Sequence, residues 1–271
     1  MELNEMQRKM LKERQLKLLE EFIAFCEMHG MEYWMIGGSL LGAVRHRGMI
    51  PWDDDIDVCM PRKDYDRLVS RADQLGKNRF LQCFETEPES GMLFAKLMDT
   101  GTVYVETSRR KMNIHHCVFI DIFPLDDYPQ GLISRTLRNL RDLFVKLRLR
   151  CLYTPAPERQ LLRAMAVRHL CELSKLLHSD VTEMCLRHRA YLRQPCRSEY
   201  MYLFAGAYGR KDVYRREWFA GTLTVRFEHL TVRIPAGYDA LLKQVYGEYM
   251  KYPAECMRKG HHDAQEFRIN A

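Results

Sequence analysis

Four aspartates lie close together in the sequence, at Asp53, Asp54, Asp55 and Asp57. Side chains alternate between the two faces of a strand, so Asp55 and Asp57 point the same way and Ile56 points toward the core. Two carboxylates on one face repel each other unless a cation lies between them. A hard divalent cation with oxygen ligands, Mg²⁺ or Mn²⁺, satisfies such a pair. The alternative is an acidic loop in contact with water.

Three features favour the metal site over a solvated loop. Apolar segments at 50–52 and 58–60 enclose the aspartates, and a later apolar segment carries its own carboxylate, Asp121. A turn of Gly37, Gly38 and Ser39 comes shortly before the acidic run and opens a helical stretch. The backbone N–H groups at a helix N-terminus can hold a phosphate. The spacing lacks the glycine and the distal glutamate of an EF-hand, which makes a calcium loop unlikely on these residues.

The composition leaves several anionic partners open. The chain has 271 residues and a net charge of +6, with 46% hydrophobic and 29% charged residues. These fractions are typical of a globular protein and exclude a collagen-like or disordered chain. A modest positive charge is compatible with nucleic acid, a phosphorylated metabolite or an anionic membrane.

The ends and cysteines of the sequence predict an intracellular location. The charged N-terminal segment lacks the apolar core of a secretory signal. No apolar stretch approaches the ~18 residues of a membrane span. The nine cysteines form no CxxC pair, as expected for small buried residues in a reducing compartment.

Hydrophobic periodicity predicts a mixed α/β fold with strands and helices interleaved. We expect helices up to residue 29, after Pro61 and over 238–250. The expected strands cover 33–36, 56–60, 80–84, 93–98, 102–105, 117–123, 223–227 and 231–234. The turn at 99–101 predicts a hairpin between the strands at 93–98 and 102–105, and a second hairpin surrounds residues 228–229.

The segment from 131 to 191 has a different character, because two leucine-rich helical patterns replace the strand signals. The first spans 131–150 and carries six cationic residues against one carboxylate, whereas the second spans 161–177. In one interpretation the leucines face the core and the charges face water. In the other, the basic surface contacts an anionic membrane that carries a lipid-linked glycan.

Longer motifs resemble those of the LicD family of phosphocholine transferases, within the nucleotidyltransferase fold, and more distantly the fukutin-related phosphoribitol transferases. They are GGSLLGAVRHRGMIPWDDDIDVCMPRKDYDRL (37–68), VFIDIFPLD (118–126), FEHLTVRIPAGYDALLKQVYGEYM (227–250) and the closing HHD (261–263). The chain departs from the family's double proline at 252–254. The resemblance implies a single domain over 1–271: a nucleotidyltransferase-like mixed sheet flanked by helices. Its catalytic core covers about 30–130, a helical insertion about 131–195, and a C-terminal hairpin and helix about 196–271.

The resemblance also implies an activity and the residues that perform it. LicD-like enzymes are expected to move phosphocholine from CDP-choline to a sugar hydroxyl and release CMP. On this basis Asp55, Asp57 and Asp121 are the catalytic and Mg²⁺-binding (or Mn²⁺-binding) carboxylates, with Asp121 as a further ligand or as the base, and Asp54 points away. The candidate substrate-binding residues are Gly38, Ser39, Arg45, Arg47, Trp52, Asp53, Lys96 and His261.

Several alternatives remain open at this point. The donor could be another CDP-alcohol, with ribitol or ethanolamine, or the enzyme could be a true nucleotidyltransferase that releases pyrophosphate. An inactive scaffold of the same fold is the alternative that is not an enzyme. The expected acceptor is a cell-surface glycan, such as lipopolysaccharide or teichoic acid, or its lipid-linked precursor. We expect a cytoplasmic protein, with peripheral contact at the inner face of the membrane as a further option, and no nucleic-acid partner.

Overall fold

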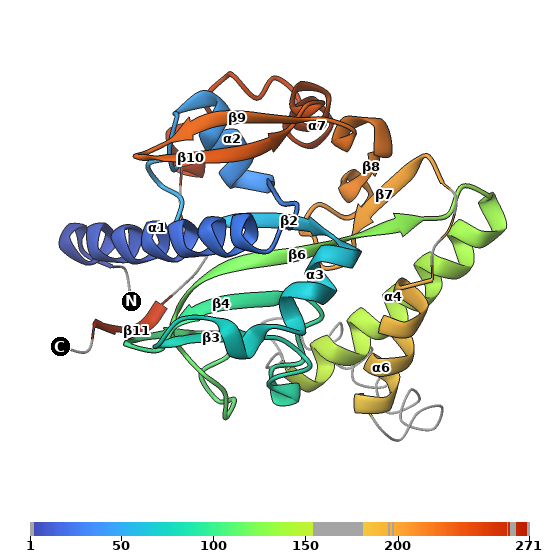
Figure 1. Cartoon of the computed structure of the whole chain (residues 1–271), viewed down its shortest axis with the longest axis horizontal. Helices are drawn as coiled ribbons and strands as arrows, with labels where there is room; N and C mark the ends of the chain where they lie inside the picture. The colour runs from blue at the N-terminus through green and yellow to red at the C-terminus, as the bar shows by residue number, and fades with distance from the viewer. Residues whose placement is uncertain are drawn as a thin grey trace.

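The structure is a computed structural model that describes residues 3–153, 181–194, 196, 198–258, 260 and 264–269. It is a mixed α/β fold, as predicted, with helices packed around a central sheet (Figure 1). The described α-helices are α1 (Glu5–Met28), α2 (Gly37–Arg45), α3 (Arg62–Val69), α4 (Leu132–Tyr153), α6 (Val181–Leu192) and α7 (Tyr238–Tyr246). The described strands are β1 (Trp34–Met35), β2 (Asp57–Pro61), β3 (Arg79–Gln82), β4 (Ala95–Asp99), β5 (Thr102–Glu106), β6 (Val118–Tyr128), β7 (Tyr200–Leu203), β8 (Val213–Arg215), β9 (Thr222–Phe227), β10 (Leu230–Pro235) and β11 (Ala264–Ile269).

The long strand β6 organises the central sheet. It pairs in parallel with β2 on one side, and β1 continues the sheet beyond β2. On its other side, the first half of β6 pairs antiparallel with β4, and its last four residues pair with β7. The strands β3 and β8 extend β4 and β7 respectively. The sheet is therefore mixed, and strands from both halves of the sequence meet on β6.

Helix α1 begins with a reciprocal capping box, in which Asn4 and Gln7 each accept a hydrogen bond from the other's backbone N–H. This arrangement satisfies two N–H groups that have no partner within the helix. The predicted apolar stripe of α1 is buried, including Leu18, Leu19 and Phe22, and the helix packs on β6 and β4. Its buried Gln15 donates a hydrogen bond from Nε2 to the carbonyl oxygen of Asp54, 2.8 Å away. Helix α1 thus holds the acidic segment in place.

The hairpin predicted between the fourth and fifth strands is wrong. Strand β5 does not pair with β4, because both edges of β4 are already occupied, by β3 and β6. Instead, β5 pairs antiparallel with β11 near the end of the chain. The predicted hairpin around 228–229 is confirmed, because β9 and β10 pair from Phe227 and Leu230 outward.

Helix α4 forms as predicted, but its orientation contradicts the interpretation that its leucines face the core. Leu137 and Leu140 are exposed, whereas Arg138 and Asp142 on the opposite face are buried. The second helix of the expected insertion, over 161–177, lies outside the described residues. Within the described part, no helix is both long enough and apolar enough to span a membrane.

Candidate active site

A row of four polar side chains crosses four neighbouring strands of the central sheet. Asp57 on β2 is the register partner of Asp121 on β6. Asp121 is in turn the register partner of Lys96 on β4, and Lys96 is that of Gln82 on β3. Register partners on neighbouring strands point to the same face of a sheet and lie about 5 Å apart. The sheet pairing therefore brings Asp57, Asp121 and Lys96 side by side, although 64 residues separate Asp57 from Asp121 in the sequence.

Lys96 is the charge partner of the buried Asp121 carboxylate. Its side chain is 2% exposed, and its Nζ lies 3.7 Å from Asp121 Oδ1 and 3.0 Å from Glu106 Oε2. The same ammonium lies 3.2 Å from the centre of the Phe119 ring. A buried charge is tolerated only when it is paired in this way. Lys96 thus compensates the negative charge of Asp121, a contact that the sequence does not indicate.

Three of the four clustered aspartates gather their carboxylates at one place. An oxygen from each of Asp53, Asp54 and Asp55 lies within 4.8 Å of the other two. Asp54 was expected to point away, and this expectation is wrong, because the chain is still irregular there and the strand begins only at Asp57. Burial and then the neighbouring Asp55 carboxylate raise the pKa of Asp53 to about 8. Oxygen donors that repel one another at this distance fit a hard divalent cation.

The turn of Gly37, Gly38 and Ser39 shapes this site from the N-terminus of α2. Gly37 has φ +58°, and a Cβ there would lie 3.0 Å from Oδ2 of Asp57. A Cβ on Gly38 would lie 2.6 Å from Oδ2 of Asp53. The Ser39 hydroxyl accepts a hydrogen bond from the backbone N–H of Asp57 at 2.8 Å. The glycines therefore leave space for two carboxylates, and Ser39 positions β2; phosphate binding by Gly38 and Ser39 stays a prediction.

Gly38→Ala is expected to lower the rate of catalysis by on the order of 10–100-fold while the fold persists, as when a group that orients a metal ligand is disturbed. The new methyl group would displace the Asp53 carboxylate, which is the flexible end of a side chain. Turnover and the melting temperature measure the two effects. Gly76→Ala is the matched control, because its Cβ would meet only Arg79 Cγ at 3.9 Å. Equal turnover in both variants would contradict the role of Gly38.

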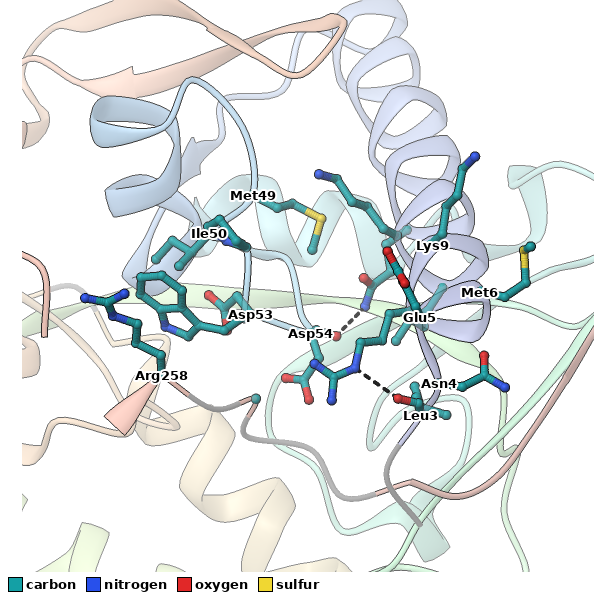
Figure 2. Close-up of a pocket in the computed structure, with 17 residues that line it drawn as sticks. Leu3, Asn4, Glu5, Met6, Lys9, Met49, Ile50, Asp53, Asp54 and Arg258 are labelled. Carbon is teal, nitrogen blue, oxygen red and sulfur yellow. Dashed lines mark hydrogen bonds between the residues drawn. The ribbon is translucent and has the colours of Figure 1, made fainter. Parts of the chain in front are cut away.

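A cleft of about 1000 Å³ opens between the first turns of α1 and the acidic segment. Figure 2 shows Asp53 and Asp54 on one wall, Lys9 on the α1 side, and Arg258 on the same side of the cleft as Asp53. Arg8 and Lys12 also line the cleft, so cationic side chains face the carboxylates across it. Such a cleft can accept a ligand that carries both negative phosphate groups and a bound metal ion.

Trp52 and Arg258 line the cleft, and both contact the ring of Tyr252. The rings of Trp52 and Tyr252 have their centres 6.2 Å apart. The guanidinium carbon of Arg258 lies 5.4 Å from the Trp52 ring centre and 5.5 Å from that of Tyr252. A cation over aromatic faces is the arrangement that also recognises quaternary ammonium groups.

Tyr208 and Tyr246 interact electrostatically with the carboxylates, which the sequence does not indicate. The hydroxyl groups of Tyr208 and Tyr246 share a hydrogen bond of 2.6 Å. Burial raises the pKa of Tyr208, and the charges of Asp57 and Asp53 raise it further. The two residues come from the loop after β7 and from α7, so only the tertiary fold brings them to the acidic residues.

Of the remaining predicted binding residues, the structure describes Arg45 and Arg47, which contact other parts of the protein. Arg45 donates from Nη1 to the carbonyl oxygen of Tyr249 at 2.7 Å, and its guanidinium lies over the Tyr252 ring. Arg47 lines a separate depression beside β9. His261 lies outside the described residues. Phosphate binding by Arg45 and Arg47 therefore stays a prediction.

Comparison with known proteins identifies relatives of the whole chain and of its N-terminal half. Residues 30–144 match the family model described as "LicD/FKTN/FKRP, nucleotidyltransferase domain". The chain is 31% identical over 265 residues to the lipopolysaccharide cholinephosphotransferase LicD of Haemophilus influenzae, which covers 93% of this chain and 96% of that protein. It is 32% identical over 109 residues to the human ribitol 5-phosphate transferase FKRP, covering 40% of this chain and 19% of FKRP.

The matched regions contain the residues that build the site. The family model covers the GGS turn, the acidic segment and the whole polar row on β2, β6 and β4. The alignment with the bacterial relative extends over almost the full length of both proteins, so the similarity is not confined to one motif. The chain therefore belongs to the LicD family.

Proposed function

We propose that this protein transfers phosphocholine from CDP-choline to a hydroxyl group of a cell-surface glycan, or of its lipid-linked precursor, and releases CMP. The observation that carries the proposal is the gathering of acidic side chains beside a cleft lined by cations and by the aromatic ring of Trp52. A bacterial relative over nearly the full length is named a lipopolysaccharide cholinephosphotransferase. The more distant FKRP is named for the transfer of ribitol 5-phosphate, which is also a phosphorylated alcohol.

The proposed metal ligands are Asp53, Asp55 and Asp57, with Asp121 as a further ligand or as the base. The short distance between the carboxylate oxygens of Asp53 and Asp55 supports the first two of these ligands. Asp57 is included because it is the register partner of Asp121 in the sheet. When bound, Mg²⁺ or Mn²⁺ would neutralise the charge of the donor pyrophosphate and make its phosphorus more open to attack. Ser39 fixes the backbone of Asp57, and Gln15 fixes that of Asp54, so the protein holds both residues in position.

In the proposed reaction the acceptor hydroxyl oxygen forms a new bond to the phosphorus that carries choline. The bond from that phosphorus to the bridging oxygen of the pyrophosphate breaks, and CMP leaves with the electron pair. The hydroxyl proton passes to the Asp121 carboxylate, which lies next to Asp57 in the sheet. The Lys96 ammonium contacts the carboxylates of both Asp121 and Glu106 and offsets one of their two negative charges.

The choline group is proposed to bind against the rings of Trp52 and Tyr252. A trimethylammonium group cannot donate hydrogen bonds, so it needs aromatic faces. The Arg258 guanidinium lies over both rings, which supports the use of this place for a cation. Arg258 would have to move aside when the donor binds.

A comparison of donors tests the proposed function. With Mg²⁺ present, CDP-choline is expected to raise the melting temperature more than CDP, CDP-ethanolamine or CDP-ribitol, because only choline gains the aromatic contacts. Trp52→Leu is expected to weaken CDP-choline binding by about 5–30-fold, the equivalent of the ~1–2 kcal/mol of a cation–π contact. The affinity of the same variant for CDP serves as its control.

The released product decides between the proposed activity and its alternatives. Transfer from CDP-choline must yield CMP, whereas a nucleotidyltransferase would use a nucleoside triphosphate and release pyrophosphate. If CDP-ribitol gave a larger thermal shift and faster transfer than CDP-choline, the protein would instead be a ribitol 5-phosphate transferase, the activity for which FKRP is named. If no CDP-alcohol is bound or turned over with Mg²⁺ or Mn²⁺, the proposal is wrong.

A further inference from the structure

Helix α4 presents an apolar stripe to solvent. Each of five large apolar side chains on it is more than half exposed: Leu132 81%, Ile133 77%, Leu137 61%, Leu140 59% and Leu143 53%. At 3.6 residues per turn they fall within an arc of about 140° on one side of the helix. A contiguous exposed apolar surface of this kind marks an interaction site rather than ordinary surface.

Buried polar contacts on the opposite side fix this orientation. Arg138 Nε donates to the Tyr202 hydroxyl at 2.9 Å, and that hydroxyl donates to Asp142 Oδ2 at 2.8 Å. Arg138 is 3% exposed and Asp142 is 7% exposed. A core-facing helix normally buries its apolar stripe. Helix α4 has a second apolar surface: Phe144, Val145 and Leu149 pack on the core, while the five exposed side chains face away from it. The hydrogen bonds to Tyr202 on β7 prevent the helix from rotating this exposed stripe inward.

Cationic side chains flank the exposed stripe. Arg141 borders it on one side and Lys146 on the other, and both are exposed. Within residues 132–149 the helix has five cationic residues and one carboxylate. Arg138, Arg148 and Asp142 are buried, so the charged side chains left at the surface are all cationic: Arg135, half-buried, and the exposed Arg141 and Lys146. Figure 1 shows α4 at the outer edge of the molecule, away from α1 and the β9–β10 hairpin. An apolar stripe between cations is the pattern of a helix that lies in the interface of an anionic membrane.

We propose that α4 docks the protein on an anionic lipid surface, with the stripe of Leu132, Ile133, Leu137, Leu140 and Leu143 inserted at the boundary between headgroups and acyl chains. The positive charge of the chain favours phosphate headgroups and disfavours a second copy of the same basic helix. The proposal does not rest on the proposed function, because lipid binding needs neither donor nor acceptor. If both hold, docking places the enzyme where a lipid-linked glycan is found.

Co-sedimentation with vesicles tests the docking surface. The full chain is expected to bind vesicles of phosphatidylcholine with phosphatidylglycerol, and to bind vesicles of phosphatidylcholine alone at least tenfold more weakly. Raising the salt from about 0.1 M to about 1 M should weaken binding, because the Debye length falls from about 10 Å to about 3 Å. Equal binding to both vesicle types, or none to either, would overturn the proposal.

A triple variant identifies the helix face. Leu137→Ser, Leu140→Ser and Leu143→Ser together are expected to reduce binding to the anionic vesicles at least tenfold, without lowering the melting temperature, because these side chains are exposed. The control replaces three other exposed apolar residues, Met28, Leu223 and Met250, by serine. The single variant Leu140→Ser, with an expected loss of a few-fold, covers the case in which the triple variant does not fold. Equal loss of binding in the triple variant and its control would overturn the assignment to α4.

Sedimentation equilibrium separates a lipid from a protein partner. The chain without vesicles is expected to be monomeric at concentrations where it binds lipid. A dimer that the triple variant abolishes, together with unchanged vesicle binding, would show that the stripe is covered by a second copy and would overturn the lipid proposal. Unchanged thermal stabilisation of the triple variant by CDP-choline would show that the catalytic site is separate.

Discussion

Asp55→Asn is expected to leave the fold intact and to reduce the transfer rate by roughly 10²–10³-fold, the loss seen when one electrostatic contact to a transition state is removed. Asp55 is one of the two aspartates, with Asp57, that strand alternation predicts on one face. It is also one of the three whose carboxylates cluster in the structure. The substitution keeps the size of the side chain but removes one negative charge from the proposed metal site. Turnover at saturating Mg²⁺ and donor measures the effect.

The stability of the same variant without metal provides a second readout. Burial, and after it the Asp55 carboxylate, raises the pKa of Asp53, so the two side chains repel each other when both are ionised. The neutral amide relieves this repulsion, so the variant should melt about 2 °C higher than the unmodified chain in the absence of metal if the relief is about 1 kcal/mol. Added Mg²⁺ should stabilise the unmodified chain but have little effect on the variant.

Asp73→Asn is the matched control for Asp55→Asn. Asp73 is exposed in a short 3₁₀ helix, Ala72–Gln74, and its loss removes the same charge from the chain. Its turnover and its response to Mg²⁺ should equal those of the unmodified chain. Near-normal turnover of Asp55→Asn would show that the carboxylate cluster is not the metal site.

Asp121→Asn is expected to reduce the transfer rate by about 10²–10⁴-fold, the range for a general base. The substitution leaves Lys96 and Glu106 in place and does not change the size of the side chain. If Asp121 is mainly the base, the affinity for Mg²⁺ and for CDP-choline should stay nearly unchanged while turnover falls. If it is mainly a ligand, metal affinity should fall with the rate.

Calorimetric titration of Mg²⁺ and of donor, set beside turnover, distinguishes the two roles of Asp121. Asp127→Asn is the control, because Asp127 lies on the same strand but pairs with Arg216 instead of the acidic cluster. Normal turnover together with normal metal affinity in Asp121→Asn would remove this residue from the site.

Local sequence determined the elements that carry the chemistry. The apolar stripe and capping residues of α1 follow from the sequence, because helix periodicity and N-capping depend on residues three and four positions apart. Ile56, directly before β2, and Val58 on β2 are buried as strand alternation predicts, although Cys59 on the other face is buried as well. The longer motifs also indicated the family, which the comparison with the bacterial relative confirms.

Tertiary structure decided which of these elements meet. The partnership of Lys96 with Asp121 depends on the register of β4 against β6, and no short-range signal specifies register between strands so far apart. The same reason explains why β5 pairs with β11, and why Tyr252 and Arg258 meet Trp52. In α4, periodicity correctly predicted a helix but not its outward face. The rotation of the helix is set by Tyr202, whose hydroxyl accepts a hydrogen bond from Arg138 and donates one to Asp142.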